Sequence, residues 1–279
     1  MILFTVLAAA PFAFPPTAAF QESAPAAAVV AAKEAADAKS AYEAIRAAYD
    51  AELDRYTTAV NELYASEEWA AANKARDREK MDALRAALPA VDGEAYARRF
   101  LDAAARYEGD AGQALFYRGV IDTTKSGELL TSAYESLLSK HAGSESAFAA
   151  TLDLSWRGGG LAEETFAGLV ERTLASDAPA AVKANVLYAR ASVLARSAGK
   201  PEDMTPEQKA AYDADMARVV EIAPDSIVAY RVQGPTFEKE RLQVGMTAPN
   251  IVGTDVFGNA MSLEQFRGKV VVLDFWGDW

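Results

Sequence analysis

The spacing of apolar residues predicts that most of this chain is α-helical. From about Ala26 to Leu88 they recur every three or four positions, with good helix formers (alanine, glutamate, lysine and arginine) between them. The recurring residues are Tyr42, Ile45, Tyr49, Leu53, Tyr56, Val60 and Leu63. Their mean spacing is close to the roughly 3.5-residue repeat of a helical seam. We favour a long hairpin that packs on its own domain over an intermolecular coiled coil, because the seam is short and mixes tyrosine with aliphatic residues.

Shorter helices are predicted after Pro89, Asp92 and Gly93, which interrupt the pattern. Their apolar residues are Tyr96, Phe100 and Tyr107; then Leu115, Phe116, Val120 and Ile121; then Leu129, Leu130, Tyr134, Leu137 and Leu138, with Gly143 as the expected residue after the helix end; then the run Ala147 to Trp156. The triplet Gly158 to Gly160 is interpreted as a hinge. A phosphate-binding loop is disfavoured, because no strand precedes the triplet and no Lys-Ser/Thr pair follows it.

Capping signals divide the next stretch into further helices. Asp177 and Pro179 suit the start of one that Gly199 closes, and Thr205 with Gln208 has capping-box spacing. The helix pairs weakly resemble tetratricopeptide-type repeats, although no strict period emerges. We therefore expect residues 27–235 to form an all-α helical module, a type of array that usually serves as a scaffold or docking surface.

The composition changes after Pro235, where alanine becomes scarce and a β-rich tail is predicted. Gly258 and Asn259 suit a hairpin turn, and Ser262 to Phe266 a single helical turn. The run from Val270 to Trp276 has the composition of a strand buried on both faces. Asp274 lies inside it, so burial would raise the pKa of its carboxyl; the alternative is an aspartate at the strand end that faces solvent.

The tail resembles the entry of the redoxin superfamily, in particular the extracytoplasmic thioredoxin-like thiol–disulfide oxidoreductases grouped with the alkyl hydroperoxide reductase and thiol-specific antioxidant proteins. The resemblance covers about the last eighth of the chain and identifies residues 244–279 as the N-terminal fragment of a thioredoxin-like α/β domain. It rests on Gly245-Met246-Thr247-Ala248-Pro249, on Asp255, Gly258, Ser262 and Leu263, and on the run from Phe266 through Gly268, Lys269 and Asp274 to Trp279.

The resemblance implies roles for three residues of the tail. Asp274 matches the buried acid that transfers a proton to the second cysteine of a C-x-x-C pair, and Trp276 and Trp279 match the aromatic residues that flank this pair. The first cysteine would follow Trp279, and its thiolate would attack a substrate disulfide. Two reasons for a chain that ends there stay open: a gene fragment, or a UGA codon for selenocysteine interpreted as a stop.

Composition and charge limit the chemistry of the chain. It contains no cysteine, so neither thiol catalysis nor a thiolate metal site is expected within it, and its single histidine, His141, suits a structural position near a helix C-terminus. The net charge of −12 disfavours nucleic acid as a partner. No cofactor and no metal are expected.

The N-terminus predicts export. Ile2 to Phe14 is apolar, too short for a membrane span and followed by small residues, as in a signal peptide of residues 1–26. No basic residue precedes this run, so the start codon could be assigned too late, and a buried N-terminal helix is the alternative. We expect a periplasmic or secreted protein without a membrane span in the mature chain.

Two functions are compatible with these observations. The first is an exported thiol–disulfide oxidoreductase of cell redox homeostasis that acts on protein disulfides or dithiols, inactive as the 279-residue chain. The second is a periplasmic helical scaffold or protein-interaction module with a degenerate redox domain, whose helical module binds a protein partner.

Overall fold

The computed structural model describes the backbone of residues 26–157, 160–199 and 203–275, and the side chains from residue 37 onward. Residues 1–25 of the predicted signal peptide, Gly158 and Gly159 of the predicted hinge, and both tail tryptophans lie outside this range. By contacts the chain divides into two compact units: the helical module, Ala24–Val232, and a C-terminal unit that includes the residues from Gln233 onward.

The fold is mainly a helical array followed by a small region with two strands, as the sequence predicts. Within the described residues the helices are α1 (Ala26–Ala65), α2 (Glu67–Ala75), α3 (Arg78–Ala86), α4 (Gly93–Arg106), α5 (Gln113–Thr123), α6 (Glu128–Lys140), α7 (Glu145–Arg157), α8 (Glu163–Ala175), α9 (Ala180–Ala198), α10 (Pro206–Ile222) and α11 (Ile227–Arg241). The strands are β1 (Val252–Thr254) and β2 (Ala260–Ser262), followed by the 3-10 helix η3 (Leu263–Phe266). Helix α11 continues through Pro235, so the change in composition there does not coincide with a helix end.

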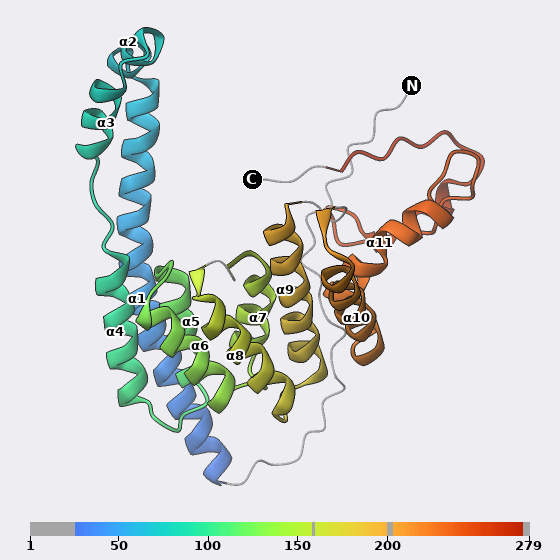
Figure 1. Cartoon of the computed structure of the whole chain (residues 1–279), viewed down its shortest axis with the longest axis horizontal. Coiled ribbons are helices and arrows are strands. Elements are labelled where there is room, and N and C mark those ends of the chain that lie inside the picture. The colour runs from blue at the N-terminus through green and yellow to red at the C-terminus, as the bar shows by residue number, and fades with distance from the viewer. Residues whose placement is uncertain (1–25, 158–159, 200–202, 276–279) are drawn as a thin grey trace. The chain divides into compact units, whose positions relative to one another are not determined.

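Helix α1 packs with its first half against its own chain. α4 runs alongside α1, and α2 and α3 follow at its far end (Figure 1). The ring of Tyr42 lies 5.5 Å from that of Phe100, and the ring of Tyr49 lies 5.2 Å from that of Tyr96. The prediction that the seam packs within its own domain is therefore confirmed for its part from Tyr42 to Tyr49.

Polar caps set many of the helix boundaries. Ser66, Asp77 and Asp92 accept backbone N–H bonds at the starts of α2, α3 and α4, and Thr205 forms the predicted capping box of α10 with Gln208.

Two predicted boundaries were wrong. α6 ends at Lys140 with His141 as its C-cap, so Gly143 does not close it, and Pro179 rather than Asp177 occupies the N-cap of α9. The reason is that the last apolar contacts of α6, made by Leu137 and Leu138, lie well before Gly143.

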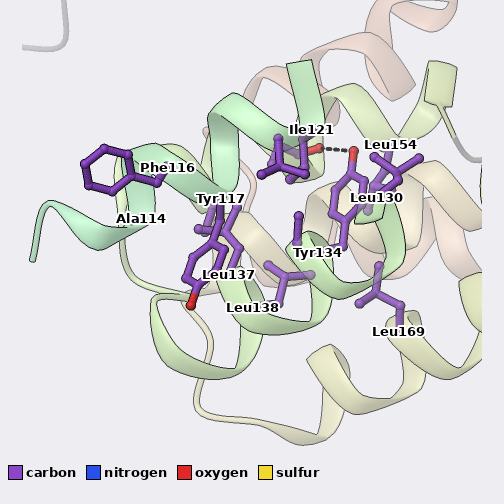
Figure 2. Packing of buried hydrophobic residues seen from close by; sticks show 14 of the residues in the cluster. Ala114, Phe116, Tyr117, Ile121, Leu130, Tyr134, Leu137, Leu138, Leu154 and Leu169 are labelled. Atoms are coloured by element: carbon purple, nitrogen blue, oxygen red, sulfur yellow. Dashed lines mark hydrogen bonds between the residues drawn. The ribbon is translucent and has the colours of Figure 1, made fainter. Parts of the chain in front are cut away.

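The core of the module is built around α5 and α6. Figure 2 shows their apolar side chains meeting residues of α7 and α8. Those with almost no exposed surface include Phe100, Phe116, Val120, Ile121, Leu130, Tyr134, Leu137, Leu154 and Val170. A second, smaller cluster around Leu187, Val219 and Val228 joins α9, α10 and the start of α11.

Two glycines permit close approach of neighbouring elements. A Cβ added at Gly119 would lie 2.7 Å from the ring of Phe100, and one added at Gly160 would lie 2.3 Å from the carbonyl oxygen of Lys125. Gly160 is therefore a packing position, which corrects the hinge prediction for this member of the triplet. The periodic sequence pattern could not show this, because the carbonyl comes from a loop more than thirty residues earlier.

A chain of ion pairs links three helices through α5. Asp122 accepts from Arg46 of α1 at 3.3 Å and from Arg118 at 2.9 Å, and Arg118 also donates to Asp153 of α7 at 2.7 Å. Arg118 and Asp122 are each about one-fifth exposed or less. These charges are thus largely withdrawn from water, where each depends on its partners.

Replacing Gly119 with alanine should destabilise the module. The new methyl group would overlap the fully buried Phe100 ring, and such overpacking costs about 1–3 kcal/mol, more than the roughly 1 kcal/mol that alanine gains over glycine in a helix. Urea titration followed by circular dichroism would measure the difference in unfolding free energy. Gly143→Ala is the control, because nothing lies within 4 Å of its Cβ position, and equal stability of the two variants would contradict the packing argument.

Replacing Asp122 with asparagine should lower the free energy of unfolding by about 1–3 kcal/mol, because it leaves Arg118 and Arg46 with weaker partners in a half-buried position. The exposed pair of Asp82 and Arg85 is the matched control, and Asp82→Asn should change stability by no more than about 0.5 kcal/mol. Thermal unfolding of both variants would measure this contrast.

Candidate functional site

The C-terminal unit contains a small hairpin whose conformation is set by local hydrogen bonds. β1 and β2 pair antiparallel, with Val252 opposite Ser262 and Thr254 opposite Ala260. The Asp255 carboxylate accepts from the backbone N–H groups of Phe257 and Asn259, and the bonds from Asn259 hold the pKa of Asp255 below its ordinary value. Gly258 takes a φ of 82°, as the predicted turn requires.

Asn250 joins the hairpin to the helical turn that follows. Its side-chain oxygen accepts from the Ser262 hydroxyl at 3.2 Å and from the Glu264 N–H at 3.0 Å. The Gln265 side chain in turn accepts from the N–H of Ser262, which fixes the start of η3. The predicted turn at Gly258 and the helical turn at Ser262 to Phe266 are both confirmed.

The described part of the predicted strand, residues 270–275, does not form a ladder with any described residue. Exposure alternates along it: Val270 and Val272 are 97% and 80% exposed, whereas Val271 and Leu273 are 40% and 43% exposed. Val271 lines a cavity of about 220 Å³ together with Phe266 and other residues of the same unit. One side of the run is therefore partly covered, and the other is open.

Asp274 is exposed, which agrees with the alternative of an aspartate that faces solvent rather than with burial in a strand. The physical reason is that burial of this position requires sheet neighbours on both sides, and no described residue pairs with the run. Trp276 and Trp279, the other two residues singled out by the resemblance, lie outside the described residues.

The helical module carries an open cleft of about 900 Å³ that sequence analysis did not single out. Tyr49, Leu53 and Tyr56 of α1 form one wall. The segment Pro89–Gly93, the first turns of α4 and α6, and the end of α5 with the loop that follows it form the remainder. The cleft exists because the chain between α3 and α4 is not helical and leaves α1 uncovered there. The sequence feature that could have indicated the cleft is the break in the helical pattern at Pro89, Asp92 and Gly93, because the apolar repeat of α1 continues without such a break.

His141 takes part in a structural hydrogen-bond chain. The Gln113 side-chain nitrogen donates to the Ala104 carbonyl at 2.9 Å, which directs its oxygen to His141 Nε2, also at 2.9 Å. Nε2 is therefore the donor. Burial, with a smaller effect of the Lys140 charge, lowers the pKa of His141. This geometry supports the predicted structural role.

The described residues include no cluster of three or more histidine, cysteine, aspartate or glutamate side chains that could hold a metal ion. Of the helices in the described range, none combines the length and the apolar character needed to span a membrane.

Part of the chain is similar to curated thiol–disulfide oxidoreductases. It is 47% identical over 47 residues to the thiol–disulfide oxidoreductase ResA of Bacillus anthracis and to that of Bacillus thuringiensis, a match that covers 17% of this chain and 27% of each relative. The ResA of Geobacillus kaustophilus is 50% identical over 42 residues, covering 15% of this chain and 24% of the relative.

The chain thus spans about a quarter of the length of these relatives. No protein-family model matches the chain, and no solved structure matches it. The similarity supports a thioredoxin-like relationship for the matched segment.

Protonation of His141 should destabilise the folded module. Its folded pKa lies below the unfolded value of about 6.5, so the unfolded chain binds the proton first and stability falls as the pH drops below that value. The test compares the unfolding free energies of the native chain and the His141→Gln variant at about pH 5.5 and about pH 7.5. The pH dependence of all other groups is shared by the two proteins, so the difference between them isolates the contribution of His141. Because His141 is the sole histidine, an NMR titration of its ring measures its pKa directly. A midpoint at or above about 6.5 would contradict a lowered pKa for His141.

Proposed function

We propose that the C-terminal unit is the first part of a thioredoxin-like domain of the redoxin superfamily. We further propose that the protein in its complete form is an exported thiol–disulfide oxidoreductase that acts on protein disulfides or dithiols in the periplasm or outside the cell. The observation that carries this proposal is the ordered series of hairpin, helical turn and apolar run that ends in Asp274, together with the 47% identity to ResA proteins over 47 residues. We infer that the matched segment is this C-terminal one, because it contains the motif residues.

The exposed apolar side chains of residues 270–275 support the proposal that further strands pair with this segment. Val270, Val272 and Phe275 are each at least 80% exposed, and fully burying side chains of this kind stabilises a protein by about 1.5–3 kcal/mol each. Sheet neighbours on both sides of the run would supply this burial. They would also pair its backbone groups, which have no ladder partner among the described residues.

The same strands would change the chemistry of Asp274. Desolvation of a carboxylate raises its pKa, which suits a group that exchanges a proton with a thiol near neutral pH. Trp276 and Trp279 would flank the redox pair in this arrangement. The 279 residues contain no cysteine, so this polypeptide alone has no thiolate to attack a disulfide.

A second function, a helical scaffold or interaction module with a degenerate redox domain, is favoured by the open cleft of the module. Its lining combines aromatic and aliphatic side chains of α1 with polar and charged ones such as Arg98, Lys125 and Glu128, and clefts of this size that combine apolar and polar groups are common binding sites. Several charges of the module also act structurally, as the Arg46, Asp122 and Arg118 chain illustrates. Binding of a protein partner without disulfide turnover would support this second function.

Insulin reduction tests the first function directly. The 279-residue polypeptide should give no reduction above background, because it lacks a thiol. Fusing its C-terminus in frame to the remainder of a thioredoxin-like domain, starting at the C-x-x-C pair, should restore turnover if residues 244–279 supply the missing first strands. A fusion that folds cooperatively but shows no insulin reduction would contradict the proposal.

In the active fusion, Asp274→Asn should reduce the rate of disulfide reduction near neutral pH by at least about tenfold, because it removes the proton-transferring group. Glu264→Gln is the matched control, since Glu264 is an exposed carboxylate of the same unit that pairs with Arg267 at 3.0 Å. Equal rates for the two variants would assign Asp274 a role without proton transfer.

A further inference from the structure

Helix α11 connects the two compact units and carries Gly234 and Pro235 in its interior. The helix begins within the helical module, whose contacts end at Val232, and continues into the C-terminal unit. Glycine and proline are the two residues that most weaken a helix interior, and both lie within three residues of this boundary. The weakest point of the helix therefore coincides with the boundary between the units.

The part of α11 before Gly234 is held by the helical module. Val228 and Ala229 are fully buried in the cluster that joins α9 and α10, and Val232 packs against the same cluster. At the start of the helix the Ser226 hydroxyl accepts from the Ala229 N–H at 3.2 Å. Since packed interiors tolerate little displacement, the direction of this part is fixed relative to α9 and α10.

The part of α11 after Pro235 has no comparable support among the described residues. Thr236 to Arg241 are all exposed, including the Phe237 ring. None of the four charged residues from Glu238 to Arg241 forms an ion pair with another described residue. The helical conformation of this part therefore depends on its own backbone hydrogen bonds.

Pro235 weakens these backbone hydrogen bonds at the junction of the two parts. A proline has no N–H group, so the Arg231 carbonyl receives no bond from residue 235, and the proline ring also crowds this carbonyl. Sharp bends in helices occur mainly at such prolines. Helical segments shorter than about 12–15 residues are only marginally stable in water by themselves, and the part of α11 after Pro235 is well below that length.

Gly234 adds conformational freedom at the same point. The residue before a proline is normally displaced from the helical conformation, because its Cβ and N–H meet the proline ring. Glycine has no Cβ, so Gly234 can adopt the helical conformation and can also leave it at little cost. Apart from the backbone of the helix itself, no described atom lies within 4 Å of an added Cβ, so close packing does not require a glycine here, in contrast to Gly119 and Gly160.

We propose that α11 is a hinge between the helical module and the C-terminal unit, and that the helix bends at Gly234 and Pro235. The first part stays packed on α9 and α10, and the second part, which belongs to the C-terminal unit, changes direction. The bend disrupts only backbone hydrogen bonds around Pro235, because the second part of the helix has no buried side chain to expose.

The consequence of this hinge for catalysis rests on the proposed function. An oxidoreductase that acts on protein disulfides must bring one redox pair to bonds that lie in surfaces of different shape. A thioredoxin-like unit that turns at Gly234 and Pro235 can meet such surfaces without rearrangement of the helical core. A few residues that absorb a change of backbone angles serve many enzymes in this way.

Distances between spin labels test the hinge in the 279-residue chain, which contains no cysteine, so labels attach only where one is introduced. One label is placed on α10 by Ala211→Cys. The second is placed before the hinge by Arg231→Cys or after it by Glu240→Cys, and all three positions are exposed. Pulsed electron paramagnetic resonance should give a distance distribution at least about twofold wider for the pair with Glu240→Cys than for the pair with Arg231→Cys.

A continuous helix should remove the motion. In the double variant Gly234→Ala with Pro235→Ala, residue 235 can donate to the Arg231 carbonyl and both residues favour a helix. The distribution of the Glu240→Cys pair should then narrow to the width of the Arg231→Cys pair, and amide hydrogen exchange of residues 236–241 should slow by at least about tenfold. Glu238→Gln is the matched control, because it changes an exposed residue of the same helix to one of similar helix propensity and should alter neither measurement.

Two results would overturn the hinge. The first is equal width for the two label pairs in the otherwise native chain, because α11 would then be straight and rigid through Pro235. The second is an unchanged width in the double variant, because the motion would then not depend on Gly234 and Pro235. Neither measurement requires a thiol or disulfide turnover. Failure of the hinge is therefore distinguishable from failure of the redox function, which the insulin assay of the fusion tests separately.

Discussion

The arrangement of the helical module depends on the burial of α5. This short helix contacts α1, α4, α6 and α7, and its apolar residues Phe116, Val120 and Ile121 have no exposed surface. Its closest neighbour is α4, because Gly119 presents no side chain to the Phe100 ring. A helix packed on all sides in this way fixes the positions of its neighbours, since interiors packed at this density tolerate little displacement.

The ion pairs of α5 add directional constraints to this packing. Arg118 and Asp122 connect the helix to α7 and α1, and their half-buried position makes each charge dependent on its partners. Charge-assisted hydrogen bonds at 2.7–3.3 Å add to this packing and further restrict rotation of one helix against the next. The first half of α1 is held by both kinds of contact. Beyond Tyr49, α1 extends past α5 toward α2 (Figure 1).

The C-terminal unit is organised in a different way. Its hairpin and helical turn are held by hydrogen bonds among neighbours in the sequence, such as those of Asp255 and Asn250. The run that follows has no such local partners, because a strand obtains its hydrogen bonds from other strands. The thioredoxin-like character of this unit therefore rests on its motif and on a similarity that covers about a quarter of the ResA proteins.

The sequence by itself determined the features that depend on local chemistry. The helical class of residues 27–235, the capping box at Thr205, the hairpin turn at Gly258 and the helical turn after Ser262 all follow from periodicity, caps and turn residues, which act within a few positions of the chain. Only the tertiary structure decided where distant segments meet. Gly160 lies against the Lys125 carbonyl, the cleft opens between Leu53 and Pro89–Gly93, and Asp274 is exposed. These outcomes depend on which surfaces pack together, and burial of an apolar or charged group is a property of its neighbours in space rather than of its own residue type.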